Sequence, residues 1–184
     1  VNLDNNSTNE SEIAREAMQS WSFIEKFIVD NNIEIEVYAA EGWIRDSNTL
    51  KIDADIYDSE TGTWFVKNDN TGEVGPPSSW KLFESFSEML VISEEKNSGL
   101  ISVSIEYYSP LIAKQWVDMY VNSINYFMQQ RQVAKTSRNI EYLKEQIGKT
   151  NIAEMEEVFY SIIEEQTKNK MLAEASPDYA FVAV

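Results

Sequence analysis

Residues 109–148 read SPLIAKQWVDMYVNSINYFMQQRQVAKTSRNIEYLKEQIG, and this stretch decides the fold. Its serine suits the N-cap of a helix and its proline suits the first turn, and no further proline or glycine occurs before Gly148. The sequence therefore predicts one helix from Pro110 to Ile147, about 57 Å long at a rise of about 1.5 Å per residue. Hydrophobic residues are dense up to Met128 and sparse after it. We therefore expect the first half of the helix to pack on a core and the second half to project from it.

The chain then turns at residues 148–151, and Asn151 with Glu154 predicts a capping box that starts a second helix, which runs to about Glu174. Two long helices joined by so short a loop lie antiparallel. The expected seam matches Ile140, Leu143 and Ile147 to Ile152, Met155 and Phe159.

Shorter patterns on either side of the hairpin predict an α/β base. Apolar residues three or four apart predict a helix from Ser11 to the turn at residues 30–32, and another helix begins at Ser78 or Ser79. Runs of alternating or continuous apolar residues predict strands at residues 33–37, 50–56, 63–67, 100–108 and 179–184. The predicted core of the base contains Trp80, Phe83, Trp116 and Phe127.

These elements predict an α+β fold, in which a small mixed sheet with helices forms a base and a long antiparallel helical hairpin protrudes. We expect a single domain over residues 1–184, a length that suits one core with a helical extension. Residues 1–128 and 172–184 would form the base, and residues 129–171 the hairpin.

Composition excludes several kinds of site. The chain has no cysteine and no histidine, which rules out disulfides, thiolate metal sites, a Ser-His-Asp triad and a histidine zinc site. It has 31 acidic and 15 basic residues and a net charge of −16 at pH 7. A surface this acidic repels phosphate backbones and anionic lipids, so we expect no nucleic-acid partner. We also predict no catalytic residue, no cofactor and no bound metal.

Three acidic or turn motifs have ordinary structural explanations. Asp53-Ala-Asp55 is similar to the metal-binding acidic pair of many glycosyltransferases, but it lies in the alternating stretch at residues 50–56, where both carboxylates share the polar side. Residues 68–72 (NDNTG) lack the first and last acidic ligands of a calcium loop and predict a hairpin turn. Glutamate pairs at residues 94–95, 156–157 and 164–165 are typical of solvated helix faces, although residue type alone keeps a glycosidase open.

One basic interval interrupts the acidic background. Arg131, Lys135 and Arg138 are four and three residues apart, so they fall on one face of the predicted helix. Most such stripes are only solvated. On a projecting hairpin of an acidic protein, they would also suit the glutamates of a neighbouring copy. These three residues are the candidate subunit contacts.

Four stretches, taken in order, carry a family resemblance. Residues 99–117 (GLISVSIEYYSPLIAKQWV), followed by residues 124–125, resemble the junction between a strand and the long helix in bacterial polysaccharide chain length determinants. Residues 14–28 resemble the first periplasmic helix, residues 163–174 the descending helix, and residues 179–184 the strand before a second membrane segment. Together they resemble the periplasmic part of bacterial polysaccharide chain length determinants, the polysaccharide co-polymerases.

The resemblance implies a bacterial inner-membrane protein with this domain in the periplasm. It implies a transmembrane helix on each side of these 184 residues. We therefore expect the 184 residues to be a fragment of a longer protein. Such proteins assemble side by side into bell-shaped rings, carry no catalytic residues, and set the modal length of a surface polysaccharide, commonly the O-antigen of lipopolysaccharide. The expected partners are further copies in a homo-oligomeric ring and a membrane polysaccharide polymerase. The growing polysaccharide stays open as a third partner.

Other classes of protein stay open as well. The periplasmic domain of a capsule or exopolysaccharide co-polymerase, or an export adaptor that sets no polymer length, fits the same pattern. A carboxylate-based glycan hydrolase would require a deep cleft with two acids about 5–10 Å apart.

Overall fold

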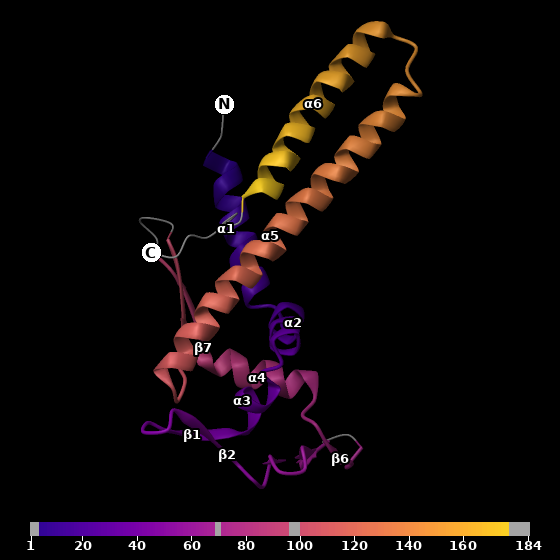
Figure 1. The fold of residues 1–184 in the computed structure, drawn as a ribbon. Helices are drawn as coiled ribbons and strands as arrows, with labels where there is room; N and C mark the ends of the chain where they lie inside the picture. Colours follow the sequence, from indigo (N-terminus) through magenta and orange to yellow (C-terminus); the bar gives the residue numbers. More distant parts are fainter. Residues whose placement is uncertain (1–3, 69–70, 96–99, 177–184) are drawn as a thin grey trace. The chain divides into compact units, whose positions relative to one another are not determined.

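The computed structural model describes residues 4–68, 71–95 and 100–176, with side chains from Glu10 onward in these ranges. The fold is α+β, as predicted. Short helices and two-stranded sheets precede two long helices, α5 (Pro110–Ile147) and α6 (Ala153–Ala175), which pack as an antiparallel pair (Figure 1). The chain divides into two compact units, Val1–Tyr120 and Val121–Val184, and the division falls within α5. That the hairpin projects stays a prediction.

The first unit contains the short elements. Its helices before α5 are α1 (Asp4–Met18), α2 (Trp21–Asn31), α3 (Glu34–Ala39) and α4 (Ser79–Met89). The strands of the described residues are β1 (Ala40–Ile44), β2 (Thr49–Ile52), β3 (Tyr57–Asp58), β4 (Thr63–Trp64), β5 (Val66–Lys67), β6 (Val74–Gly75), β7 (Leu90–Glu94) and β8 (Ile101–Ile105). They pair in sequence order as antiparallel ladders β1–β2, β3–β4, β5–β6 and β7–β8, where the sequence predicts one mixed sheet. Each ladder joins neighbours in sequence, which short connections favour.

The single helix predicted from Ser11 is interrupted and forms two helices. Between α1 and α2, Ser20 has extended backbone, and its hydroxyl accepts a hydrogen bond from the Phe23 amide at 3.4 Å. A serine in this position caps the helix that follows it. The predicted end at residues 30–32 is confirmed, because Asn32 adopts the left-handed conformation that closes α2.

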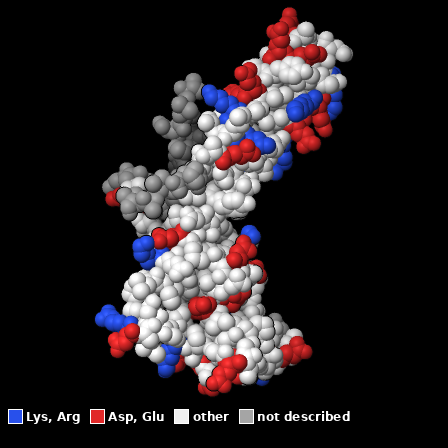
Figure 2. Space-filling model, viewed as in Figure 1, with Lys and Arg blue, Asp and Glu red and all other residues white. Residues whose placement is uncertain are grey.

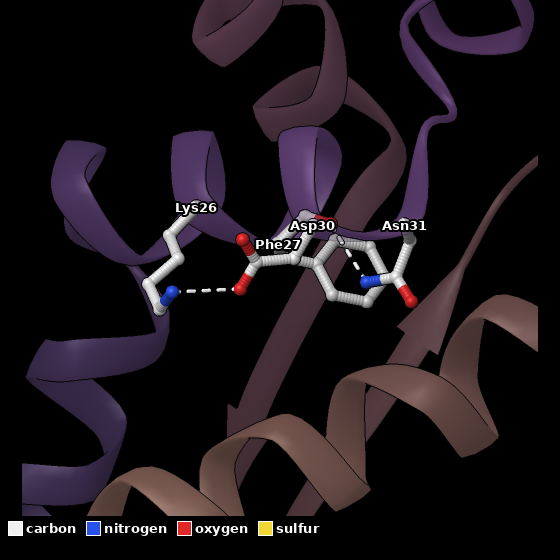
Figure 3. A network of polar contacts seen from close by, with 4 residues as sticks. All are labelled: Lys26, Phe27, Asp30 and Asn31. Atoms are coloured by element: carbon white, nitrogen blue, oxygen red, sulfur yellow. Dashed lines mark hydrogen bonds and ion pairs between the residues drawn. The ribbon is translucent and has the colours of Figure 1, made fainter.

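Polar contacts at the end of α2 are local (Figure 3). The Asn31 side-chain amide donates to the Phe27 carbonyl oxygen at 2.7 Å, and Lys26 forms an ion pair with Asp30 at 2.7 Å. The Asn31 side chain thus bonds back to the carbonyl group four residues before it, within the last turns of its own helix. The ion pair is exposed to solvent, so it contributes little to stability.

The strand predicted at residues 33–37 is wrong, because most of this segment forms helix α3. Ile33 and Val37 are buried and four residues apart, a spacing that suits a helix face as well as one side of a strand. The Val37 amide donates to the Ile33 carbonyl oxygen at 2.9 Å. Glu34 and Glu36 lie in the first turn, where carboxylates favour the helix dipole.

Two further differences concern strand boundaries. Strand β2 ends at Ile52, and the Asp53 carboxylate accepts a hydrogen bond from the Asp55 amide at 2.9 Å, which turns the chain there. The sequence pattern gives no sign of β7, which follows α4 directly without a turn residue. Strand β7 pairs along its whole length with β8, which lies inside the strand predicted at residues 100–108.

The core of the first unit is aromatic. Phe27, Phe86 and Tyr120 are buried, and their ring centroids lie 4.8–5.7 Å apart. Tilted and edge-to-face arrangements at this spacing are favourable. Trp116 is buried as predicted, with its ring 6.0 Å from that of Phe86. The hydroxyl group of Tyr120 donates to the Met18 carbonyl oxygen, so its polar end is satisfied.

Of the other three residues of the predicted core, Phe83 is half-buried and two are exposed. Trp80 is 47% exposed and Phe127 is 39% exposed. The buried pair on α4 is Leu82 and Phe86, four residues apart, so the inward face of the helix is centred on these two residues and not on Trp80. The predicted start of α4 is correct, because the Ser78 hydroxyl accepts from the Lys81 amide at 3.3 Å.

Candidate subunit-contact surface

The second unit is built on the seam between α5 and α6. Half-buried or buried residues recur at alternating steps of three and four on both helices, the heptad spacing of paired helices. On α5 they are Gln129, Val133, Thr136, Ile140, Leu143 and Ile147. On α6 they are Glu156, Phe159, Ile163, Gln166, Lys170 and Ala173. Polar and charged side chains thus occupy many of the positions that would normally be aliphatic.

The predicted seam is correct on α5 and partly wrong on α6. Phe159 is half-buried, but Ile152 and Met155 are 56% and 41% exposed. The cause is the start of the helix: Ile152, not Asn151, is the N-cap, and no side chain caps it. The predicted capping box is therefore absent.

Gln129 fixes the other end of the pair. Its side-chain amide nitrogen donates to the carbonyl oxygens of Ala173 at 2.8 Å and Ser176 at 3.2 Å. Carbonyls in the last turn of a helix have no partner within the helix, so a donor from the neighbouring helix satisfies them. This contact sets the register of α5 against α6. From the sequence, we did not place Gln129 in the seam. The heptad spacing could have shown it, because Gln129 lies four residues before Val133.

The candidate residues lie on α5, outside this seam. Arg131, Lys135 and Arg138 are all exposed. In the described part of the chain, none of the three forms an ion pair with a carboxylate. By contrast, Lys149 pairs with Glu145 at 3.6 Å along the same hairpin. Blue and red side chains are interspersed along the visible face of the helix pair (Figure 2). The basic stripe therefore carries three charges that no carboxylate of the described residues pairs with.

Large apolar side chains are exposed on α6. Met155, Val158 and Tyr160 near its start and Met171 and Leu172 near its end are between 41% and 63% exposed. Met171 and Leu172 line a shallow groove of about 580 Å³ along this helix. Exposed apolar groups that gather on one element are typical of contact surfaces.

The acidic and turn motifs have structural roles. Asp53 and Asp55 belong to a turn, not to the alternating strand that the sequence predicts, and the Asp53 side chain is used by that turn. The predicted turn at residues 68–72 is confirmed in its described residues, because the Gly72 amide donates to the Asn68 carbonyl oxygen at 2.9 Å and Gly72 has a φ of 72°. Across the described residues, no three acidic side chains are grouped closely enough to hold a metal ion.

The glutamate pairs are dispersed. Glu94 forms an ion pair with Arg15 at 3.4 Å, and Glu156 occupies a seam position on α6. Glu157, Glu164 and Glu165 are exposed on α6, which therefore carries carboxylates that a cation of another molecule could reach.

Four titratable groups among the described residues have pKa values that are shifted for structural reasons. Burial raises the pKa of Tyr120, and burial together with the nearby Glu36 raises the pKa of Tyr107. A hydrogen bond from Thr61 lowers the pKa of Asp58, and the bond to Glu41 raises the pKa of Lys51. These groups organise turns and core contacts, and they do not form an acid-base pair.

In residues 4–68, 71–95 and 100–176, no helix has both the length and the apolar character required to cross a membrane. Searches against protein-family models, curated proteins and solved structures found no match for this chain.

Proposed function

We propose that this chain is the periplasmic part of a polysaccharide chain length determinant. In this role it is a non-enzymatic scaffold that assembles with further copies of itself, acts with a membrane polymerase, and sets the modal length of a surface polysaccharide such as O-antigen. The resemblance of four stretches to that family supports the proposal.

The observation that carries the proposal is the surface of the helix pair. The seam of α5 and α6 contains charged and amide side chains, while apolar residues such as Met171 and Leu172 remain exposed on α6. Half-buried polar groups at the seam and exposed apolar groups on α6 leave apolar surface that a further contact could bury. A neighbouring copy placed beside the pair would cover that apolar surface, and rings repeat such contacts around a closed symmetry.

The charges on the two helices predict which surfaces of neighbouring copies would face each other. The basic stripe lies on α5, and exposed carboxylates such as Glu157 and Glu164 lie on α6. In a side-by-side arrangement, the α5 of one copy would face the α6 of the next. This heterologous contact repeats around a ring until it closes.

The decisive experiment is deletion of the gene in the source bacterium, followed by complementation with the full-length gene. The O-antigen ladder on a gel should lose its modal length and become short or evenly distributed, and complementation should restore it. A capsule or exopolysaccharide that changes size while the O-antigen ladder stays the same would assign the chain to that branch of the family. Unchanged lengths of all surface polysaccharides would overturn the proposal and favour an adaptor.

The alternative of a glycan hydrolase has its own test. The purified chain, incubated with the surface polysaccharide of the same bacterium, should release no reducing ends. Asp53→Asn combined with Asp55→Asn should leave polymer length unchanged, because the Asp53 carboxylate serves a local turn. Loss of length control with the fold intact would bring back a metal-binding or catalytic role for this pair.

A further inference from the structure

The first unit contains a cleft that the proposed scaffold role does not use. It lies between the β5–β6 hairpin and the start of α4 and has a volume of about 320 Å³. Its lining includes Lys67 and Asn68 from the hairpin and Trp80, Lys81 and Glu84 from the helix. The volume is at the lower end of the range typical of small-molecule sites, about 300–1,000 Å³.

Trp80 is held in place at this cleft while nearly half of it stays exposed. Its ring centroid lies 5.2 Å from that of Trp21, in an edge-to-face arrangement, and 5.1 Å from that of Phe83. The indole nitrogen of Trp21 donates to the Ser79 hydroxyl at 2.7 Å, which fixes Trp21 in turn. An aromatic side chain that is already ordered costs a ligand less conformational entropy on binding.

The polar groups of the cleft include both donors and an acceptor. Within the described residues, the Lys67 ammonium, the Trp80 indole N–H and the Glu84 carboxylate have no hydrogen-bond or ion-pair partner. Trp80 and Glu84 are four residues apart on α4, so they share one face of the helix. The Lys81 ammonium donates to the Lys67 carbonyl oxygen at 3.1 Å and ties the helix to the hairpin.

This combination suits a sugar. Hydroxyl groups both donate and accept, so they can use the ammonium, the indole N–H and the carboxylate together. The C–H-rich face of a pyranose ring packs well on an aromatic ring, whose π face is negative. A phosphate group could pair with the lysines but would leave the Glu84 carboxylate beside a like charge, and an apolar peptide would leave the charged groups unpaired.

We propose that the cleft lined by Trp80, Lys67 and Glu84 binds one or two sugar residues of the surface polysaccharide. The choice of the surface polysaccharide as the ligand and the link between its binding and polymer length rest on the proposed function, whereas the suitability of the cleft for a sugar rests on its lining residues. In a ring of copies, each copy would carry one such weak site, and many weak sites along one polymer act together through effective concentration.

Binding is tested by calorimetric titration of the 184-residue chain with oligosaccharides, prepared by partial acid hydrolysis of the surface polysaccharide of the source bacterium. Trp80→Ala should weaken binding by about tenfold or more, and Trp80→Phe should weaken it less because an aromatic face is kept. Glu84→Gln should also weaken binding by several-fold, because one strong acceptor is lost. Tyr108→Ala is the matched control, since Tyr108 is 50% exposed and does not line the cleft.

Circular dichroism and thermal unfolding of each variant separate a loss of binding from a loss of fold. Because Trp80 is half-exposed, we expect its variants to fold. Glu84 is exposed on α4, so Glu84→Gln is a second test of binding that changes no aromatic contact. No heat of binding with the wild-type chain, or equal affinity in Trp80→Ala and the wild type, would overturn the proposal.

A cellular experiment separates the two proposals. The full-length gene carrying Trp80→Ala is introduced into the deletion strain, and the polysaccharide ladder is compared with that from the wild-type gene. An altered modal length would support sugar binding as part of length control. A normal ladder from a variant that has lost binding in the titration would overturn that link while leaving the scaffold role intact.

Discussion

In the first unit, the rings of Phe27, Phe86 and Tyr120 are buried and lie within 5.7 Å of one another. In the second unit, α5 and α6 meet through half-buried residues that include a glutamate and a lysine. The first arrangement buries large apolar surfaces and supplies its own stability. The second buries less and leaves apolar groups exposed on α6, so added contacts can still stabilise it. The difference predicts that the stability of the first unit depends on its own aromatic core, whereas the stability of the second unit would respond more to added contacts.

Removing the centre of the aromatic core should have the largest effect. Phe86 is fully buried and contacts the rings of Phe27, Trp116 and Tyr120. Phe86→Ala should lower the free energy of unfolding by about 3–5 kcal/mol, measured by urea denaturation. Phe65→Ala is the control, because Phe65 is 46% exposed, and its cost should stay below about 1 kcal/mol. Similar costs for both variants would show that the rings of the core do not dominate the stability of this unit.

The buried hydroxyl group of the same core provides a pH-dependent test. Tyr120→Phe removes the donor to the Met18 carbonyl oxygen and should cost about 1–2 kcal/mol at neutral pH. Burial raises the pKa of Tyr120 in the folded state, whereas an unfolded tyrosine titrates near pH 10. Above about pH 10 the unfolded state loses a proton that the folded state keeps, so stability falls as the pH rises.

Tyr107 adds a second contribution of the same sign, because its pKa is also raised by burial. Tyr120→Phe should therefore reduce the loss of stability above about pH 10 without abolishing it. Tyr126→Phe, at a side chain that is 63% exposed, is the control for the loss of a tyrosine hydroxyl group as such. An unchanged slope in Tyr120→Phe would mean that this hydroxyl ionises in the folded protein as it does in the unfolded chain.

The seam of the helix pair should give a smaller and local effect. Phe159 is half-buried, so Phe159→Ala should cost about 1–2 kcal/mol, less than a fully buried phenylalanine. Hydrogen exchange should speed up at amides of α6, while amides of α2 and α4 keep their protection. Tyr160→Ala is the matched control at the next position, where the side chain is 60% exposed. Equal loss of protection in both units would show that they unfold together.

Sequence patterns predicted the long elements well because these depend on local chemistry. Ser109, Pro110 and Gly148 mark the ends of α5, and the Ser109 hydroxyl accepts from the Ile112 amide as a cap should. Prediction fails where two periods fit the same residues: Ile33 and Val37 match both a strand and a helix. Strand β7 depends on its pairing with β8, which no local pattern shows. The strand predicted at residues 179–184 lies outside the described residues.

The candidate site was only partly predictable for the same reason. The spacing of Arg131, Lys135 and Arg138 places them on one helix face, as the structure confirms. The contact from Gln129 to the end of α6 joins residues more than forty positions apart, so it depends on the register of the pair. Trp80 was expected in the core, because hydrophobicity alone does not distinguish a core tryptophan from one at the edge of a cleft.

The smallest effect on stability should come from the basic stripe, and this makes it a clean test of assembly. Changing Arg131, Lys135 and Arg138 to Gln should alter the free energy of unfolding by less than about 0.5 kcal/mol, because in the described residues they have no intrachain ion pair. The change moves the net charge from −16 to −19, which by itself increases repulsion between copies. A control with the same charge is therefore needed, and Lys26, Lys51 and Lys114 of the first unit, all changed to Gln, supply it.

Association of the 184-residue chain would be measured by light scattering at about 0.05 and 0.5 M salt, which screens charges strongly at the higher value. Net repulsion predicts that salt promotes association of the control, and of the stripe variant as well. If the stripe pairs with carboxylates of a neighbour, the wild type should associate more strongly than either variant at low salt, and the stripe variant should lose more association than the control. At the higher salt concentration, the difference in association between the wild type and the stripe variant should then become smaller, because salt screens an attraction that only the intact stripe makes. Equal association of the stripe variant and the control at both salt concentrations would mean that the three cations are only solvated, and would leave the exposed apolar groups of α6 as the candidate for a contact between copies.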